Sequence, residues 1–223
     1  MSDGILIIAP DSDLNTVADL LAAAQGFRVN VLRGYVTGRE ALKEIASGRY
    51  QIVHFAGHGC VDSVQASDGP LDDEYLEMAL RSSAVELVLL NTCASVTMAA
   101  KLYRAGVAPR VIGWRIDVGD SVAVAWAAAF YAALALGADY WEAYLHSAEV
   151  MRTRVPDFER PVFLNGRIAL LEQQVIAIQA KVDGLNQAVV LPRRTLALAL
   201  AAAAALILAF HTLVAPHLQV VVR

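Results

Sequence analysis

A histidine and a cysteine, each at the end of an apolar stretch, are the residues of this chain best placed to do chemistry. Residues 52–59 lead into the glycine-flanked His58, and residues 85–95 lead into Cys93. The chain between them has the length of a β-α-β crossover, so both stretches can end on one edge of a parallel sheet. There an imidazole can take the thiol proton, and the thiolate can attack a carbonyl carbon. The pattern predicts His58 as general base and Cys93 as nucleophile.

Backbone amides beside these residues could complete such a site. We expect the N–H groups of Gly59 and Cys93 to form an oxyanion hole. A histidine and a cysteine at strand ends can also be purely structural, and their spacing alone leaves both interpretations open. His54 lies within the first stretch, and we predict that it is a buried, hydrogen-bonded core histidine.

The remaining candidate ligands argue against a metal site. Cys60 is predicted to be a small loop or core residue, and His146 lies within a helical stretch without a partner at metal-binding spacing. No Cys-x-x-Cys pattern occurs, so we expect no metal and no cofactor. Two cysteines do not indicate a disulfide framework. The net charge of −4, without a cluster of Lys and Arg, argues against nucleic-acid binding.

The elements that must position the pair alternate between strand and helix. We expect strands at 5–9, 27–32, 52–56, 85–91, 110–114 and 161–164. We expect helices at 14–25, 37–47, 72–82, 95–105, 121–136 and 139–154, the last with a capping box from Asp139 and Glu142. Residues 60–71 are expected to form a loop. This order predicts an α/β domain over residues 1–166, with a mainly parallel sheet flanked by helices.

A heptad pattern follows the predicted domain. Its seam positions are apolar: Ile168, Leu171, Val175, Ile178, Val182, Leu185 and Val189. This pattern predicts a coiled-coil linker helix over 167–191, and its residue types favour a parallel two-stranded coil. We therefore expect a homo-oligomer that associates through residues 168–189. A single amphipathic helix packed on the domain is the alternative.

Residues 195–215 contain no charged side chain and predict a transmembrane helix. At about 1.5 Å rise per residue the segment can cross a hydrocarbon core of about 30 Å. Arg193 and Arg194 precede it, whereas only Arg223 follows in the short tail 216–223. By the positive-inside rule we expect a single-pass protein of the inner (cell) membrane with a cytoplasmic N-terminal domain. The first residues lack the pattern of a signal peptide. A buried core helix is the alternative for 195–215.

Several segments resemble one peptidase family in the family's own order. They are the stretch around His58, Asp68-Gly69, the block 89–95, Ala105-Gly106-Val107, 111–114, Asp120 with Phe130-Tyr131, 137–148 and 162–166. Together they cover most of residues 1–166 and are similar to the CHAT peptidases, caspase-like cysteine proteases related to separase, gingipains and caspases. The resemblance implies a caspase–haemoglobinase fold, His58 and Cys93 as catalytic dyad, and cleavage after one chosen residue of a peptide or protein substrate.

The specificity pocket that the resemblance implies lies near the turn containing Asp117 and Asp120. Both acids could line it, or they could be cap and turn residues, as we favour for Asp120. The acid usual in the family after the Trp is Arg115 here, and Val124 occupies a position where relatives that cleave after Arg or Lys carry an acid. The preferred substrate residue stays open.

These patterns favour a membrane-anchored cysteine endopeptidase that a protein partner activates, by analogy in bacterial defence or cell death. A catalytically silent scaffold, with the transmembrane helix as effector or oligomerisation element, is the main alternative. A doubly wound signalling domain is a third possibility, but it does not explain where His58 and Cys93 lie.

Overall fold

The computed structural model describes residues 4–10, 20, 24, 26–155 and 159–165. The chain divides into two units, Met1–Ala169 and Leu170–Arg223, and every described residue belongs to the first unit. The predicted coiled coil at 167–191 and the predicted membrane span at 195–215 therefore lie outside the described residues. Among the helices that are described, none is long and apolar enough to cross a bilayer.

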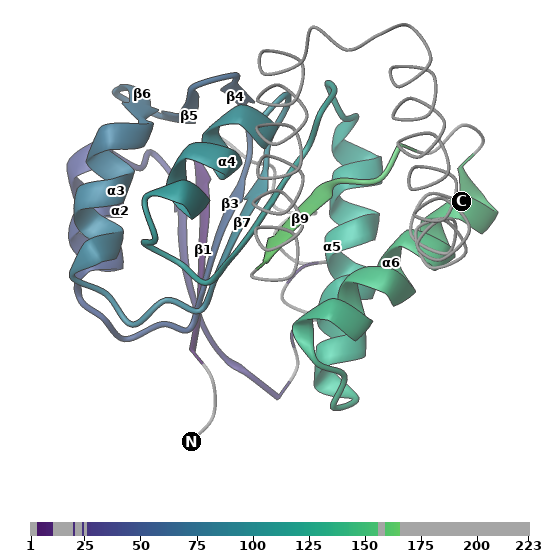
Figure 1. Ribbon diagram of the computed structural model, residues 1–223. Helices are drawn as coiled ribbons and strands as arrows, with labels where there is room; N and C mark the ends of the chain where they lie inside the picture. The colour runs from purple at the N-terminus through teal and green to yellow at the C-terminus, as the bar shows by residue number, and fades with distance from the viewer. Residues whose placement is uncertain (1–3, 11–19, 21–23, 25, 156–158, 166–223) are drawn as a thin grey trace, which may run out of the picture. The chain divides into compact units, whose positions relative to one another are not determined.

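A twisted sheet forms the centre of the domain (Figure 1). Within the described residues it has six strands in the order β2-β1-β3-β7-β8-β9. They are β1 (Gly4–Pro10), β2 (Arg28–Gly34), β3 (Ile52–Ala56), β7 (Leu87–Asn91), β8 (Arg110–Gly113) and β9 (Val162–Asn165). All neighbours pair in parallel except β8 and β9, which are antiparallel. The prediction of a mainly parallel sheet is confirmed.

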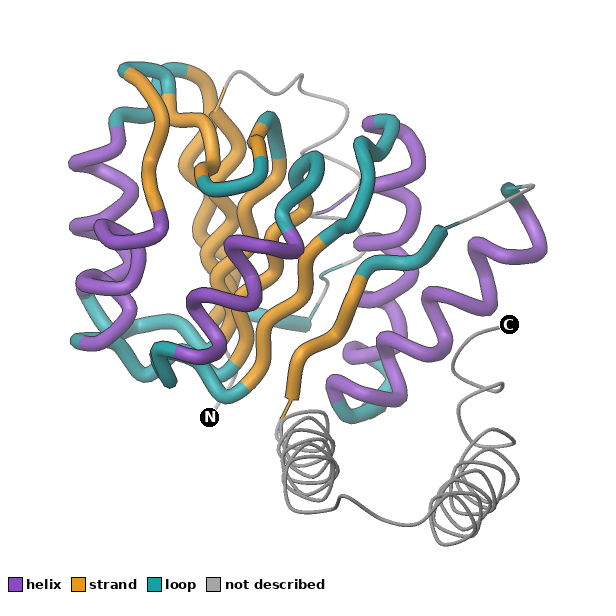
Figure 2. The backbone as a smooth tube through the Cα atoms, turned by 45° about the horizontal axis from the view of Figure 1, so that its top comes forward, coloured by secondary structure: helices purple, strands orange, loops and turns teal. Residues whose placement is uncertain are grey.

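Helices cover both faces of this sheet, as the two views in Figures 1 and 2 show. On one face lie α2 (Gly38–Ala46), α3 (Asp73–Arg81) and α4 (Val96–Arg104), and on the other lie α5 (Asp120–Ala135) and α6 (Tyr140–Arg154). Successive strand residues alternate between the two cores. Val53 and Phe55 pack with the α2, α3 and α4 side, whereas Ile52 and Ala56 pack with the α5 and α6 side. Burial on both faces explains why the strands are continuous apolar runs.

Helix starts follow the capping residues of the sequence. Thr37 caps α2 by accepting a hydrogen bond from the Glu40 N–H. At α6 the Asp139 carboxylate accepts from the backbone of Glu142, whose carboxylate accepts from the Asp139 N–H, so the predicted capping box is confirmed. Most of the helix predicted at 14–25 lies outside the described residues.

The segment expected to be a loop at 60–71 is instead a small antiparallel sheet, so that expectation was wrong. Its strands are β4 (Gly59–Cys60), β5 (Ser63–Ala66) and β6 (Gly69–Asp72). They lie above the carboxyl ends of β3 and β7 in Figure 1. Val64 and Leu71 are buried in the core on the α2, α3 and α4 side, which holds the small sheet against the domain.

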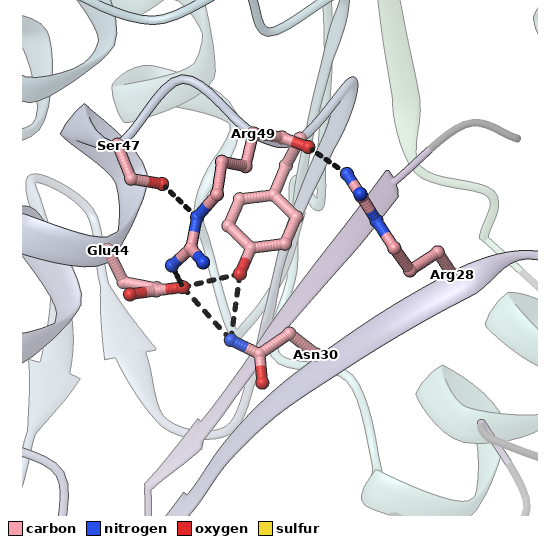
Figure 3. Close-up of polar contacts among 6 residues, drawn as sticks. Arg28, Asn30, Glu44, Ser47 and Arg49 are labelled. Carbon is pink, nitrogen blue, oxygen red and sulfur yellow. Dashed lines mark hydrogen bonds and ion pairs between the residues drawn. The ribbon is translucent and has the colours of Figure 1, made fainter. Parts of the chain in front are cut away.

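A polar cluster fixes the return of the chain from α2 to β3 (Figure 3). The Glu44 carboxylate accepts hydrogen bonds from the Asn30 amide, the Tyr50 hydroxyl and the Arg49 guanidinium. Burial, and then the hydrogen bond to Glu44, raise the pKa of Tyr50. The cluster joins α2 to β2 and to the residues just before β3, so it secures the entry into the strand that leads to His58.

His54 is fully buried in β3, as predicted, and it pairs with α5. Its Nδ1 lies 2.9 Å from the Tyr131 hydroxyl, while its Nε2 has no partner among the described residues. Burial lowers the pKa of His54 to about 3 and raises that of Tyr131. Both side chains are therefore neutral in the folded protein near neutral pH.

This buried histidine should make the domain less stable in mild acid. Between pH 6.5 and the folded-state pKa of about 3, the unfolded chain binds a proton at His54 that the folded chain does not. From neutral pH to about pH 5 this group should lower the free energy of unfolding by about 2 kcal/mol. The double substitution His54→Leu with Tyr131→Phe should remove that component without leaving an unpaired hydroxyl.

Urea denaturation followed by tryptophan fluorescence measures this effect in the full chain, because all three tryptophans lie in the described domain. The exposed His146 supplies a matched control, and His146→Gln should keep the wild-type pH dependence. An unchanged pH dependence in the double variant would contradict the assignment to His54.

Candidate active site

His58 and Cys93 lie beyond two neighbouring strands, at the carboxyl edge of the sheet. β3 and β7 pair in parallel, and their last paired residues are Ala56 and Asn91. His58 and Cys93 each come two residues after this pair. The two loops therefore leave the sheet side by side, at its upper edge in Figure 1. The structure brings both predicted residues to one edge.

Cys93 occupies a tight turn between β7 and α4. Its side chain is partly exposed, and its thiol points at the Val118 carbonyl oxygen, 3.6 Å away. Ala94 adopts the left-handed conformation with φ 49°, unusual for a residue with a Cβ, and α4 starts at Val96. Such backbone strain persists only where the surroundings hold it in place. The turn places the thiol just before the N-terminus of α4.

The segment that follows β8 runs beside this turn and holds it. The Val96 N–H donates to the Trp114 carbonyl at 2.8 Å, and the Ala94 N–H donates to the Ile116 carbonyl at 3.0 Å. With the thiol contact to Val118, alternate carbonyls of 114–118 therefore face the cysteine turn. We call residues 114–118 the strap.

Two buried polar side chains fasten the turn and the strap together. The Ser95 hydroxyl donates a hydrogen bond to the Thr92 carbonyl at 2.8 Å. The same hydroxyl accepts one from the Trp114 N–H at 3.1 Å. The Asn91 amide accepts from the Trp114 indole N–H at 2.9 Å and donates to the Ala123 carbonyl at 3.0 Å. Sequence reasoning missed both residues. The signal for them was a polar side chain at each end of the cysteine turn, next to an apolar run.

His58 is exposed and directly precedes β4, the first strand of the small antiparallel sheet. Its carbonyl accepts from the Gln65 N–H at 3.0 Å, and Gly59 pairs with Val64. In this register Gly59 is a non-hydrogen-bonded position, so its N–H points away from β5 and is not used by the ladder. The backbone thus leaves the Gly59 N–H, one of the two predicted oxyanion donors, outside the sheet's own hydrogen bonds.

Ion pairs connect α4, the helix that follows Cys93, to the tip of the β4–β5 hairpin and to the start of α3. The Lys101 ammonium on α4 lies 3.0 Å from the Asp62 carboxylate and 3.3 Å from that of Asp73. The hydrogen bond to Asp62 is the main reason why the pKa of Lys101 is raised. Exposed pairs of this kind add little stability, but they restrict where the hairpin can lie.

The other residues singled out from the sequence, Asp117, Asp120, Cys60 and His146, are all exposed. Asp117 is exposed on the strap, and Asp120 is the first residue of α5, where a carboxylate interacts favourably with the helix dipole. Cys60 is exposed in β4, with its sulfur 3.0 Å from the Ser63 hydroxyl, and this hydrogen bond lowers the pKa of the Cys60 thiol. His146 is exposed on α6. Within the described residues, no three His, Cys, Asp or Glu side chains gather as a metal site would require.

A comparison with known families decides where this fold belongs. Residues 8–163 match the CHAT domain. The chain belongs to the CHAT domain family. The match includes both loops of the candidate site and agrees with the resemblance of the block 89–95. A search among curated proteins finds no significant match.

Solved structures of cysteine proteases are similar to this CHAT domain. The Arg-specific cysteine proteinase gingipain R has a TM-score of 0.50 and 12% identity, with coverage of 69% of this chain and 43% of that chain. A secreted C11 cysteine protease from Bacteroides thetaiotaomicron, in complex with an irreversible peptide inhibitor, has a TM-score of 0.49 and 13% identity, with coverage of 70% and 60%. This chain therefore spans less than two thirds of either protein. At these identities the likeness to gingipain R is one of fold, which is caspase-like.

Removing the Ser95 hydroxyl should destabilise the CHAT domain. Ser95→Ala takes a hydrogen-bond partner from the Trp114 N–H and from the Thr92 carbonyl in a fully buried place. We expect a loss of about 1–3 kcal/mol in the free energy of unfolding, measured by urea denaturation. Ser82→Ala removes one part-buried bond from an exposed serine to the Ala79 carbonyl and should stay within about 0.5 kcal/mol of the wild type. Equal effects of the two substitutions would show that Ser95 does not hold the turn.

Proposed function

We propose that this CHAT protein is a cysteine endopeptidase that hydrolyses peptide bonds of protein substrates. The proposal rests on one observation above all, the equal distance of His58 and Cys93 beyond the paired ends of β3 and β7. Membership of the CHAT family and the caspase-like fold support the same reaction.

The proposed reaction uses the two side chains in sequence. His58 takes the thiol proton, and the Cys93 thiolate attacks the peptide carbonyl to give a tetrahedral oxyanion. The N–H groups of Gly59 and Cys93 donate hydrogen bonds to that oxyanion. His58 then protonates the leaving amine, and the thioester that remains is hydrolysed by water with His58 again as base. Neither a metal nor a cofactor takes part in these steps.

The strap is the proposed wall of the substrate pocket. Asp117 is exposed on it, three residues past Trp114, and is better placed to meet a substrate side chain than Asp120. Asp120 begins α5, where its charge already interacts with the helix N-terminus.

Anchoring in the inner membrane completes the proposal. Residues 195–215 would span the bilayer once, residues 168–189 would associate two copies, and the CHAT domain would face the cytoplasm. Tethering would raise the effective concentration of membrane-proximal substrates. Activation by a partner protein, in a bacterial defence or cell-death pathway, is proposed by family analogy alone.

Cys93→Ala and His58→Ala should each abolish proteolysis while the domain stays folded. New protein N-termini, mapped in cells that express the full chain with its genomic neighbours, report cleavage of any cellular protein, so the substrate need not be chosen beforehand. Loss of an activated nucleophile or its base commonly lowers the rate by about 10³-fold or more. The exposed thiol of Cys60 provides the control, since Cys60→Ala should keep the cleavage pattern.

The same variants distinguish the peptidase from the silent scaffold. A peptidyl probe with a thiol-reactive group should label Cys93 in the presence of the activating neighbours. Unchanged N-termini in the Cys93→Ala cells, together with no labelling of Cys93, would refute the peptidase and favour the scaffold.

Deletion of residues 195–223 should release the protein from the membrane. The full chain should stay with the membrane pellet after alkaline carbonate extraction, because only an inserted segment survives that treatment, and the deleted protein should appear in the supernatant. Deleting 216–223 alone is the control and should leave the protein in the pellet. Full chain in the supernatant would contradict the proposed anchor.

A further inference from the structure

Two glycines flank His58, and the space available for a side chain differs between them. A Cβ placed on Gly57 would have its nearest neighbour at 3.6 Å, the Pro10 carbonyl oxygen, which is an ordinary contact. A Cβ placed on Gly59 would lie 2.7 Å from Thr92 Oγ1 and 2.8 Å from Thr92 Cβ. Real Cβ atoms do not approach others so closely. Only glycine fits at 59, because the Thr92 side chain occupies the space that a side chain there would need.

Thr92 cannot move away from this contact by changing its rotamer. Rotation about χ1 moves the hydroxyl and the methyl group, but the Cβ stays where the backbone puts it. Thr92 follows the last residue of β7 directly, and its side chain is 2% exposed. Its hydroxyl has no hydrogen-bond partner among the described residues, so this side chain acts here through its shape.

The contact joins the two loops next to the residues proposed for catalysis. Gly59 follows His58, and Thr92 precedes Cys93. Thr92 continues the alternate positions of Val88 and Leu90, which face the core on the α2, α3 and α4 side. The thiol of Cys93 instead reaches Val118, just ahead of α5. The loops thus touch on one face of the sheet, and the thiol lies toward the other.

We propose that Thr92 is a positioning residue: packed against Gly59, it acts as a spacer that sets the separation between the His58 imidazole and the Cys93 thiol. The spacer deepens the proposed function and rests on it, since a fixed separation matters only if the two groups exchange a proton. A small displacement of reacting groups is enough to lower a rate greatly, on the order of 10²-fold for about 1 Å.

Alkylation of Cys93 measures this separation without a substrate or an activator. In the full chain with Cys60→Ser, Cys93 is the one remaining cysteine. Its thiolate displaces iodide from iodoacetamide and forms a thioether. A thiolate stabilised by a neighbouring imidazolium reacts well below the ordinary thiol pKa of about 8.5. The parent protein should therefore show a low-pH limb in its rate profile, meaning that alkylation is still measurable at about pH 6. His58→Ala should remove this limb.

Gly59→Ala should lower the rate at about pH 6 on the order of 10²-fold and leave an ordinary thiol profile. Gly57→Ala is the matched control and should stay within about twofold of the parent, because its Cβ makes only an ordinary contact with Pro10. Thr92→Gly, combined with Gly59→Ala, removes the two atoms that lie within 3.0 Å and leaves only the Ser63 carbonyl oxygen at 3.1 Å, so it should restore part of the lost rate. A merely structural role for either residue would not predict rescue by a second substitution.

Thr92→Val and Thr92→Gly test the spacer even if Gly59→Ala does not fold. Valine keeps the shape and loses only the unpartnered hydroxyl, so its profile should match the parent, whereas glycine should weaken the low-pH limb. Equal profiles for these two variants would overturn the spacer, as would equal profiles for Gly57→Ala and Gly59→Ala. A parent profile that His58→Ala leaves unchanged would instead refute the dyad, and the spacer with it.

Discussion

The parallel pairing of β3 with β7 is the interaction on which the candidate site depends. Ala56 and Asn91 are opposite each other at the last rung of this ladder, so the chain leaves both strands at the same height. Each strand is buried along its whole length, and a slip of one residue would turn its apolar side chains from one core to the other. The two cores therefore fix the register, and the register fixes which loop residues meet.

A buried strand that ends in a tight turn must satisfy its polar groups within the protein. Asn91 and Ser95 do this by bonding to the strap and to the start of α5. Each bond adds little net free energy, but a missing partner in this place would cost the desolvation of the group left behind. The result is a cysteine turn whose shape depends on β8 and α5 as much as on its own residues.

The sequence predicted the elements that show clear periodicity and missed what depends on contacts between distant residues. Apolar runs and caps located the six strands of the main sheet to within two residues and also the helices from α2 to α6. Strand ends with family motifs pointed to His58 and Cys93 as candidates. The strands β4 to β6 have at most four residues each, too few to show a period. Ser95 and Asn91 bond to Trp114, which is 19 and 23 residues away, so no local pattern announces them. The fit of Thr92 against Gly59 is likewise a matter of side-chain shape that only coordinates show.

The left-handed conformation of Ala94 limits which substitutions the cysteine turn can accept without changing its shape. A non-glycine residue in that conformation costs about 1 kcal/mol or more, which glycine would largely avoid. Glycine would also let the residue after Cys93 sample many other backbone angles. The alanine methyl group reduces the number of accessible backbone conformations, and the hydrogen bonds around the turn stabilise the strained left-handed conformation. Local stability is thus traded for a defined thiol direction, and a search for a more heat-resistant variant could relax this turn and lose the site's geometry.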